Sequence, residues 1–335
     1  MKLEERLSAF IKLNQILIEL SAPERAEIIT QAGNNNHWFN APNVEKSIKG
    51  LIHLTEPIKM KSWLNSYKIK SVKQKIIGLI MAGNIPLVGF HDLMCVLLSG
   101  HKAIVKLSSQ DLFLMQWIIQ KICEIEPAFI KQINVCEKLK DMDAVIATGS
   151  NNTARYFDYY FGKYPNIIRK NRTSLAILTG NETDTELIEL GKDVFTYFGL
   201  GCRNVSKLWV PKNYNFSPLL NLWSAFKRVT DNFKYQNNYD YNKSIYLVNG
   251  IAHLDTGFLL LTESEAFNSP ISVLYYQQYQ SSSDLNKYLA EQQDKIQCIV
   301  SNQASKKFIP FGKTQIPEVS DYADGVDVMQ FLNTI

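Results

Sequence analysis

The residue best suited to covalent chemistry in this sequence is Cys202, which follows two closely spaced glycines, Gly199 and Gly201. A helical pattern runs into this segment, and an alternating strand pattern at 206–210 carries the chain away. Glycine permits tight turns and close backbone approach, so the sulfur can point into a cleft with the cysteine N–H facing the same way. Such an arrangement suits a nucleophile with support for an oxyanion. The alternative is a buried structural cysteine, because free cysteine is among the most buried residue types.

Three other polar turns each follow a short apolar segment typical of a strand buried on both faces. Asn84 follows 76–82, Ser109 follows 103–107, and the segment 148–150 follows 142–147. A helical pattern comes after each turn, and this alternation predicts an open parallel sheet with helices on both faces. Ligands of such sheets bind at the carboxyl ends of the strands, where these turns fall.

The turns also have structural interpretations. Asn84 can be a turn residue that tolerates unusual torsions. Gly149 and Ser150 can form an ordinary helix N-cap, although a helix N-terminus is also an anion site. No Gly-x-Gly-x-x-Gly fingerprint follows a strand, and no Gly-x-Ser-x-Gly elbow of a serine hydrolase is present.

Composition excludes several classes of protein. A chain of 335 residues is long enough for about two domains, and its net charge of +4 is too small to indicate nucleic-acid binding. The apolar region 76–98 is interrupted by Gly83, Pro86 and Asp92, so it does not predict a membrane span. No histidines are paired at metal-ligand spacing, and we predict no metal site. The chain has five cysteines, which are Cys95, Cys123, Cys136, Cys202 and Cys298. This odd number, together with the charged residues at the start of the sequence, favours a cytoplasmic protein.

The remaining elements follow from periodicity and capping signals. Helices are expected at 2–32, 44–54, 87–98, 109–123, 151–161, 183–198, 216–230 and 284–292, with capping boxes at Ser21/Glu24 and Thr183/Glu186. In the second half, strands are expected at 174–178, 206–210, 245–248, 257–262, 271–276 and 296–300. Residues 233–246 are rich in Tyr and Asn, which indicates an exposed loop or, alternatively, a ligand-facing flap.

Several short motifs occur in an order that resembles the aldehyde dehydrogenase superfamily, and more closely its LuxC-type acyl-CoA reductase family. The similarity runs from about residue 74 to the end of the chain. It rests on the asparagine turn at 83–86, the lysine strand at 103–106, the turn at 148–150, the cysteine segment at 201–202, and the closing motifs at 311–313 and 321–327. Each motif is short, and the specificity comes from their order and spacing.

The resemblance implies an aldehyde-dehydrogenase-like α/β fold with two α/β domains, each with an open and mostly parallel sheet, and an active site in the cleft between them. We expect N-terminal helices and a dinucleotide-binding domain at 1–170, a catalytic domain at 171–318, and a C-terminal tail at 319–335 that returns to the cofactor domain.

The resemblance also implies roles for individual residues. Cys202 is the nucleophile, and the Asn84 amide and the Cys202 N–H stabilise the oxyanion. Glu265 resembles the acidic residue that holds the nicotinamide ribose. The alternative interpretation of Glu265 is a solvated carboxylate on a loop. The remaining expected cofactor contacts are Lys106, Ser109, Thr148, Gly149 and Ser150.

Two departures from the superfamily pattern refine the expected activity. Ile168 falls where aldehyde dehydrogenases have a glutamate base that activates water, so hydrolysis of an acyl-enzyme is disfavoured. Ser109 falls where a glutamate often binds the adenosine ribose, and a serine does not repel a 2′-phosphate, to which Lys106 adds attraction. We therefore expect NADPH rather than NADH.

The predicted function is NADPH-dependent reduction of a fatty acyl thioester, carried by coenzyme A or by a protein, to the aldehyde through an acyl-Cys202 intermediate. An acyl-phosphate reductase of the glutamyl-phosphate reductase type, or a non-catalytic dinucleotide- or acyl-CoA-binding protein, stays open as an alternative. An acyltransferase partner and a homo-oligomer also stay open.

Overall fold

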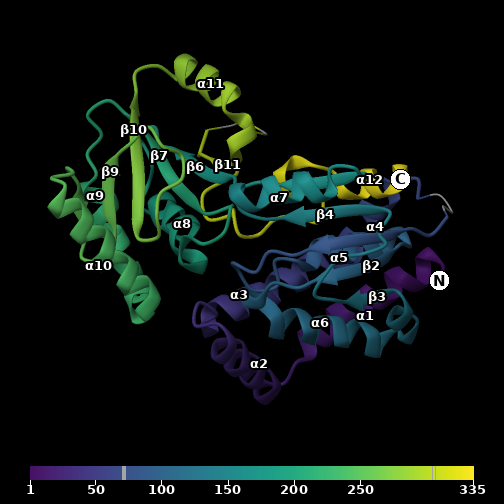
Figure 1. The fold of residues 1–335 in the computed structure, drawn as a ribbon. Coiled ribbons are helices and arrows are strands. Elements are labelled where there is room, and N and C mark those ends of the chain that lie inside the picture. The colour runs from purple at the N-terminus through teal and green to yellow at the C-terminus, as the bar shows by residue number, and fades with distance from the viewer. Residues whose placement is uncertain (70–72, 304, 306) are drawn as a thin grey trace. The chain divides into compact units, whose positions relative to one another are not determined.

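The computed structural model describes residues 1–69, 73–303, 305 and 307–335. This part of the chain forms two compact units (Figure 1). Each unit has a hydrophobic core of its own. The first unit consists of Met1–Asn171 and Pro317–Ile335, and the second is Arg172–Ile316.

The first unit begins with helices that cap and pack according to local sequence signals. The Ser21/Glu24 capping box is confirmed, because Ser21 N–H donates to Glu24 Oε2 (2.9 Å) and Ser21 Oγ accepts from Glu24 N–H (3.4 Å). These helices are α1 (Leu3–Glu19), α2 (Ala22–Asn35), α3 (Ala41–Leu54) and α4 (Pro57–Asn65).

A five-stranded parallel sheet follows, in the order β3-β2-β1-β4-β5. The central strand β1 explains the apolar run in the sequence, because Ile77 and Leu79 are 0% and 1% exposed. The strands are β1 (Ile76–Ile80), β2 (Lys102–Lys106), β3 (Ile133–Val135), β4 (Ala144–Thr148) and β5 (Asn166–Arg169).

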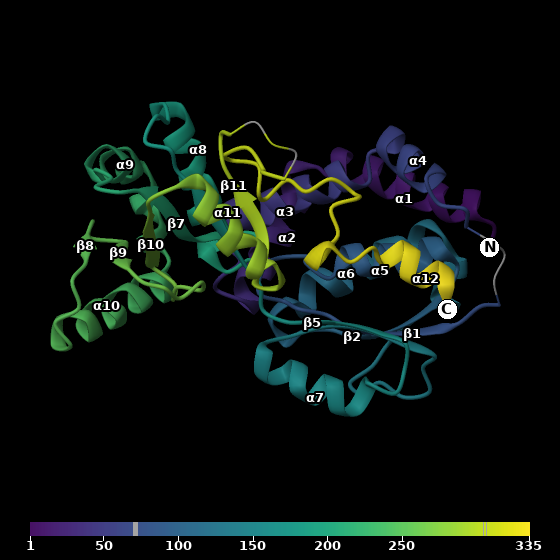
Figure 2. The same ribbon diagram turned by 90° about the horizontal axis from the view of Figure 1, so that it is seen from above.

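Helices cover both faces of this sheet, as the strand–turn–helix alternation predicts. Figure 2 shows α5, α6 and α12 over one face and α7 over the other. Their bounds are α5 (Phe90–Ser99), α6 (Leu112–Ile125), α7 (Asn151–Phe161) and α12 (Val328–Thr334). The predicted helix at 87–98 begins only at Phe90, because Leu87 takes a left-handed conformation with φ of 61°.

The second unit contains a six-stranded sheet in the order β11-β6-β7-β10-β9-β8, parallel except for the β8–β9 pair. Helices α8 and α9 share a core with Leu208 and Leu274, whereas α11 packs on the opposite face against Leu175 and Trp209. The strands are β6 (Thr173–Ile177), β7 (Val205–Pro211), β8 (Leu254–Asp255), β9 (Leu260–Glu263), β10 (Val273–Tyr279) and β11 (Ile296–Val300). The helices are α8 (Asp184–Phe195), α9 (Ser217–Trp223), α10 (Phe233–Val248) and α11 (Ser282–Glu291).

Two expectations about secondary structure are wrong. The segment expected to be an exposed loop at 233–246, with a strand at 245–248, is the helix α10. The Asn232 side chain caps it, and Tyr235, Tyr239, Asn242 and Tyr246 recur at helical spacing on its buried side. In addition, the short strands β3 and β5 occur where none was predicted.

Two general findings concern the described residues as a whole. None of their helices combines the length and the apolar character that crossing a membrane requires. They also contain no cluster of three or more His, Cys, Asp or Glu side chains suited to a metal ion.

Candidate active site

Cys202 lies in the second unit, on the turn between α8 and β7, and its side chain is exposed. Cys95 and Cys298 are buried, and Cys123 and Cys136 are partly buried. The interpretation of Cys202 as a buried structural cysteine is therefore wrong. An exposed thiol on a short turn is open to reagents and substrates, which a reactive cysteine requires.

Three consecutive residues between α8 and Cys202 have left-handed backbone conformations: Tyr197 (φ 54°), Phe198 (φ 58°) and Gly199 (φ 77°). This conformation costs about 1–2 kcal/mol for each residue other than glycine. Both aromatic side chains are buried, and the Phe198 ring centroid lies 6.0 Å from that of Tyr235. Burial of the rings offsets the backbone strain, and the chain reverses direction before it reaches Cys202.

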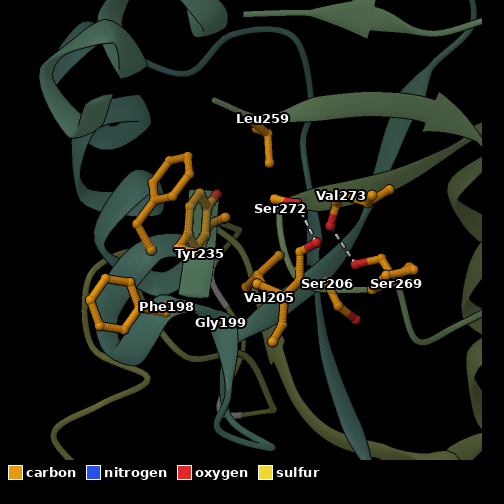
Figure 3. Close-up of a pocket in the computed structure, with 13 residues that line it drawn as sticks. Phe198, Gly199, Val205, Ser206, Tyr235, Leu259, Ser269, Ser272 and Val273 are labelled. Carbon is orange, nitrogen blue, oxygen red and sulfur yellow. Dashed lines mark hydrogen bonds between the residues drawn. The ribbon is translucent and has the colours of Figure 1, made fainter. Parts of the chain in front are cut away.

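A pocket lies beside this reversal (Figure 3). Phe198 and Gly199 line it before the cysteine, Val205 lines it after the cysteine, and Tyr235 and Ser272 complete its walls from other segments. Its volume is about 330 Å³, including the part that is open to solvent, and Cys202 itself is not a lining residue. The residues on both sides of Cys202 therefore border this pocket, and polar contacts to other segments also hold the turn.

Asn204 provides several of these contacts and is only 2% exposed. The side-chain Oδ1 of Asn204 accepts a hydrogen bond from Gly201 N–H (2.9 Å), and the backbone N–H of Asn204 donates to Gly201 O (3.0 Å). Its Nδ2 donates to the backbone carbonyls of Asp193 (2.9 Å) and Thr196 (2.8 Å) at the end of α8. One buried side chain thus joins the helix end to the turn that carries Cys202.

Asp193, near the end of α8, holds the segment 312–314 beside the turn and is 1% exposed. Its carboxyl accepts from Gly312 N–H (2.7 Å), Thr314 N–H (3.1 Å) and the Thr314 hydroxyl (2.8 Å). Burial raises the pKa of Asp193, and the bonds from Gly312 and Thr314 oppose part of that increase. Arg203 Nε donates to the Thr314 carbonyl (2.6 Å), so the residue after Cys202 is held by the same segment.

The backbone carbonyl of Cys202 also has a partner. The Ser174 hydroxyl on β6 donates to this oxygen at 3.0 Å, and Ser174 is fully buried. The bond fixes the orientation of the peptide that follows Cys202.

Glu265 lies beyond β9, and its side chain is exposed. Lys207, on β7, is fully buried and donates to Glu265 O (3.0 Å) and Gln277 Oε1 (2.7 Å); burial lowers the pKa of Lys207 to about 8. The Ser206 hydroxyl donates to Phe267 O (2.9 Å). These bonds tie the segment of Glu265 to the first half of β7, the strand that begins just after Cys202.

The other candidate residues lie in the first unit, at the carboxyl edge of its sheet. Asn84 follows β1, Lys106 ends β2 and Thr148 ends β4. In the order β3-β2-β1-β4-β5, the direction of the connections reverses between β1 and β4. Ligands of open α/β sheets bind outside the carboxyl ends of the strands at such a reversal.

The turn after β4 suits an anion. The Ser150 hydroxyl accepts from Thr153 N–H (3.2 Å) and caps α7. A Cβ on Gly149 would lie 2.8 Å from Phe157 Cε2, so glycine allows the turn to pack against its own helix. The N-cap interpretation of Ser150 is confirmed, and it leaves the helix N-terminus available for a phosphate.

Lys106 and Ser109 are both exposed. Ser108 caps the 3₁₀ turn η1 (Ser109–Asp111), because its Oγ accepts from Gln110 N–H (3.2 Å). An exposed lysine and hydroxyl beside the N-terminus of α6 fit the ribose and phosphate groups of a dinucleotide.

The position of the absent glutamate base lies on β5, where Ile168 is partly buried. The next residue, Arg169, is 4% exposed and forms a two-pronged ion pair with Asp92 of α5, at 2.5 and 3.0 Å. Burial favours the neutral form of each partner, but the pairing outweighs it, lowering the pKa of Asp92 and raising that of Arg169. Position 168, where aldehyde dehydrogenases have the glutamate base, is an isoleucine and offers no carboxylate.

The predicted residues therefore fall into two sets, with Asn84, Lys106, Ser109 and the 148–150 turn in the first unit, and Cys202 and Glu265 in the second. Sequence reasoning missed the buried polar residues behind these turns: Asp111, Asp193, Asn204 and Lys207. The available signal was a polar residue on the apolar side of an amphipathic helix, as with Asp193, which follows Leu190 by three positions in α8.

Comparison with solved structures identifies the fold. Aldehyde dehydrogenase 21 from Physcomitrella patens, in complex with the reaction product succinate, gives a TM-score of 0.72 at 11% identity over 100% of this chain and 84% of that chain. An indole-3-acetaldehyde dehydrogenase from P. syringae gives 0.68 at 13% identity, over 91% of this chain and 73% of that chain. The NAD⁺ complex of an aldehyde dehydrogenase from Bacillus cereus gives 0.63 at 13% identity, over 92% and 73%.

These structures confirm the predicted aldehyde-dehydrogenase-like α/β fold. A search of curated proteins gave no match. The model of the acyl-CoA reductase (LuxC) family matches residues 14–216, which is more than half of the chain and includes Asn84, the 148–150 turn and Cys202. The chain therefore belongs to the LuxC family of acyl-CoA reductases, enzymes of acyl and aldehyde oxidoreduction.

Proposed function

We propose that this protein reduces a fatty acyl thioester to the aldehyde with NADPH, through a thioester on Cys202. The observation that carries the proposal is the exposed thiol of Cys202 on a turn whose backbone is fixed on both sides by buried partners. An exposed nucleophile on a rigid turn is what covalent catalysis requires, because a displacement of about 1 Å can cost about 10² in rate.

In the first step the Cys202 thiolate attacks the carbonyl carbon of the substrate thioester, and the thiol of the acyl carrier leaves. The exchange makes one C–S bond and breaks another, so it needs little acid catalysis. The chemistry that the cofactor supplies when bound is a hydride for the carbonyl carbon of acyl-Cys202. Collapse of the thiohemiacetal on Cys202 then releases the aldehyde and restores the thiolate.

Both steps place negative charge on the substrate oxygen, and the proposal assigns its stabilisation to the Asn84 amide and the Cys202 N–H. Loss of one such donor typically lowers the rate by about 10²–10³. The bond from Ser174 to Cys202 O and the bond from Asn204 to Gly201 N–H hold the peptides around Cys202 in place.

Hydrolysis would divert the Cys202 thioester to the acid. Ile168 cannot accept a proton from water, and the neighbouring Arg169 is a cation already paired with Asp92. The proposed site therefore contains no group at that position to activate water, which favours reduction over hydrolysis.

For the cofactor, we assign the first unit to dinucleotide binding and the second to the nucleophile. Residues 1–170 would carry Lys106 and Ser109 for the adenosine ribose and Thr148, Gly149 and Ser150 for the pyrophosphate, and 319–335 would complete that domain. Residues 171–318 would carry Glu265 for the nicotinamide ribose. The NAD⁺ complexes among the similar structures support a nicotinamide dinucleotide, and the absence of a carboxylate at Ser109 favours NADPH.

The test measures oxidation of NADPH and NADH with panels of acyl-CoA, acyl-protein and acyl-phosphate substrates. We expect acyl-thioester-dependent NADPH oxidation with aldehyde release, and a Cys202 peptide whose mass increases by one acyl group when cofactor is omitted. Cys202→Ala abolishes both signals, whereas Cys123→Ala, at a partly buried cysteine of α6, retains them.

Full activity of Cys202→Ala would refute the mechanism. Turnover of acyl phosphates but not of thioesters would instead favour an acyl-phosphate reductase. Thioester binding without turnover would favour a non-catalytic binding protein, and dependence on an added acyltransferase would identify an acyl-protein substrate.

A further inference from the structure

Asp111 is a buried carboxylic acid in the first unit that the proposed mechanism does not use. It ends η1, just after Ser109, and is 2% exposed. Its Oδ2 accepts a hydrogen bond from Leu87 N–H at 2.7 Å, whereas its buried Oδ1 has no hydrogen-bond partner among the described residues.

Leu87 belongs to the segment 83–87 that contains Asn84, between β1 and α5. Its φ of 61° is unusual for a bulky residue, and its side chain is 3% exposed. A buried N–H in a strained turn needs a partner, and Asp111 is that partner.

The same segment meets the 108–111 turn at its other end. A Cβ on Gly83 would lie 2.5 Å from Ser108 Oγ and 3.1 Å from Asp111 N, so only glycine allows this approach. The Asn84 turn is thus held at both ends, by contact at Gly83 and by the hydrogen bond at Leu87. The two turns, which are separate in the sequence, form one interlocked unit.

We propose that Asp111 is a positioning residue that couples the Asn84 turn to the cofactor-binding segment 106–109. The inference rests on the proposed function, because it assumes that Asn84 stabilises the oxyanion and that Lys106 and Ser109 contact the cofactor. Contact of the cofactor with Ser109 would restrain η1, and the bond from Leu87 to Asp111 would transmit that restraint to the Asn84 turn. A bound cofactor therefore orders the oxyanion donor before the acyl group reacts.

The Asp111 carboxyl acts as a neutral acceptor in this arrangement. Burial raises the pKa of Asp111 to about 8, and the Leu87 N–H lowers it only in part. Burial and the Leu87 N–H are the influences on this pKa, and no charged group of α2, α6 or the 83–87 turn is among them. A neutral amide can replace such a group, whereas a methyl group cannot.

The test compares Asp111→Ala with Asp111→Asn. The control is Asp143→Ala, which removes a similar carboxyl-to-backbone bond, to Ile76 N–H (2.8 Å), at the other end of β1. We expect Asp111→Ala to lower kcat by about 10- to 100-fold, because the Leu87 N–H loses its partner. Asp111→Asn and Asp143→Ala should stay within about 3-fold of the wild-type kcat.

A second measurement does not depend on activity. Hydrogen exchange of the backbone amides at 84–90 should slow when NADPH binds to the wild type and to Asp111→Asn, but not when it binds to Asp111→Ala. If cofactor protects 84–90 equally in Asp111→Ala, or if Asp111→Asn is as impaired as Asp111→Ala, the coupling is refuted. Absence of thioester reduction by the wild type would refute the proposed function alone, and the exchange experiment would still decide the coupling.

Discussion

Asn204 offers the sharpest test of how the Cys202 turn is held. Asn204→Ala removes the acceptor for Gly201 N–H and the donor for the Asp193 and Thr196 carbonyls. Each hydrogen bond contributes about 1 kcal/mol net, and each buried group left without a partner costs about 1–3 kcal/mol. We therefore expect the free energy of unfolding of the second unit to fall by about 2–4 kcal/mol.

The turn should also lose its fixed geometry, because three left-handed residues and a pocket adjoin it. We expect thioester reduction to fall by about 10- to 100-fold, with most of the loss in kcat, since the reacting sulfur is displaced rather than removed. The assays are denaturant unfolding followed by tryptophan fluorescence, alkylation of Cys202 followed by mass spectrometry, and acyl-CoA-dependent NADPH oxidation.

The matched control is Asn242→Ala. Asn242 is also a buried asparagine of the second unit, 6% exposed, and its Nδ2 donates to Asn238 O (2.9 Å) and Ile271 O (3.0 Å). Its loss should lower stability by a similar amount while leaving kcat within about 3-fold. The reasoning is wrong if both variants lose stability alike and Asn204→Ala keeps the wild-type kcat and alkylation rate.

Asn204→Asp separates shape from hydrogen-bond polarity. The carboxylate keeps the acceptor for Gly201 N–H but turns an oxygen toward the Asp193 and Thr196 carbonyls. Repulsion and burial would raise the pKa of the new acid in the folded state, so its destabilising effect grows as the pH rises above about 4. We expect this variant to be less stable than Asn204→Ala at pH 7.5, and a reversed order would contradict the assigned bonds.

Two further predictions concern buried ionisable side chains in the first unit. Burial raises the pKa of Asp111 in the folded protein to about 8, against an ordinary value of 3.8, so the free energy of unfolding of the wild type falls as the pH rises from 4 to 8. The free energy of unfolding of Asp111→Asn, measured relative to that of the wild type, should therefore increase by about 4 kcal/mol between pH 4 and 7.5. A pH-independent difference in urea unfolding would show that the acid is ionised in the folded state. Asp92→Ala should cost about 3–5 kcal/mol, because it leaves the Arg169 guanidinium buried without its partner. In a double-mutant cycle built from Asp92→Leu and Arg169→Met, the double variant should recover most of the stability that the Asp92→Leu single variant loses, and additive losses would show that the two side chains are not coupled.

Local signals in the sequence were sufficient for much of the fold. The Thr183/Glu186 capping box is confirmed, because Thr183 N–H bonds Glu186 Oε2 (2.8 Å) and Glu186 N–H bonds Thr183 Oγ1 (3.3 Å). Such pairs lie three residues apart, so their geometry does not depend on the rest of the chain. The positions of the apolar strands were equally predictable, since β1 and β4 are buried on both faces and consist largely of apolar residues.

The segment 233–248 shows where composition misleads. Its many Tyr and Asn residues indicated an exposed loop, but tyrosine can bury its ring and keep its hydroxyl bonded, as Tyr239 does with Asp255 (2.5 Å). The spacing of Tyr235, Tyr239, Asn242 and Tyr246 is helical and was the more reliable signal. The short strands β3 and β5 were missed because three or four residues carry too little periodicity to identify.

The partners of the buried polar residues could not be predicted, because folding alone brings them together. Asp193 meets Thr314 across 121 positions, and Asp111 meets Leu87 across 24 positions. The helical spacing that places Asp193 on the apolar side of α8 suggests a buried acceptor, but the sequence does not say which N–H donates to it. The turns themselves were visible in the sequence, and the contacts that fix them were not.

The two candidate turns share one physical solution. Backbone N–H groups in the loops between regular elements have no ladder partners, and a buried aspartate supplies an acceptor in each unit: Asp111 for Leu87 N–H, and Asp193 for Gly312 and Thr314 N–H. Burial raises the pKa of both acids, so each turn depends on an acceptor that gains charge as the pH rises. Rigidity at the proposed oxyanion donor and nucleophile therefore depends on buried acids that take no part in the proposed chemistry. At Asp111, whose pKa burial raises to about 8, this dependence links the geometry of the Asn84 turn to pH.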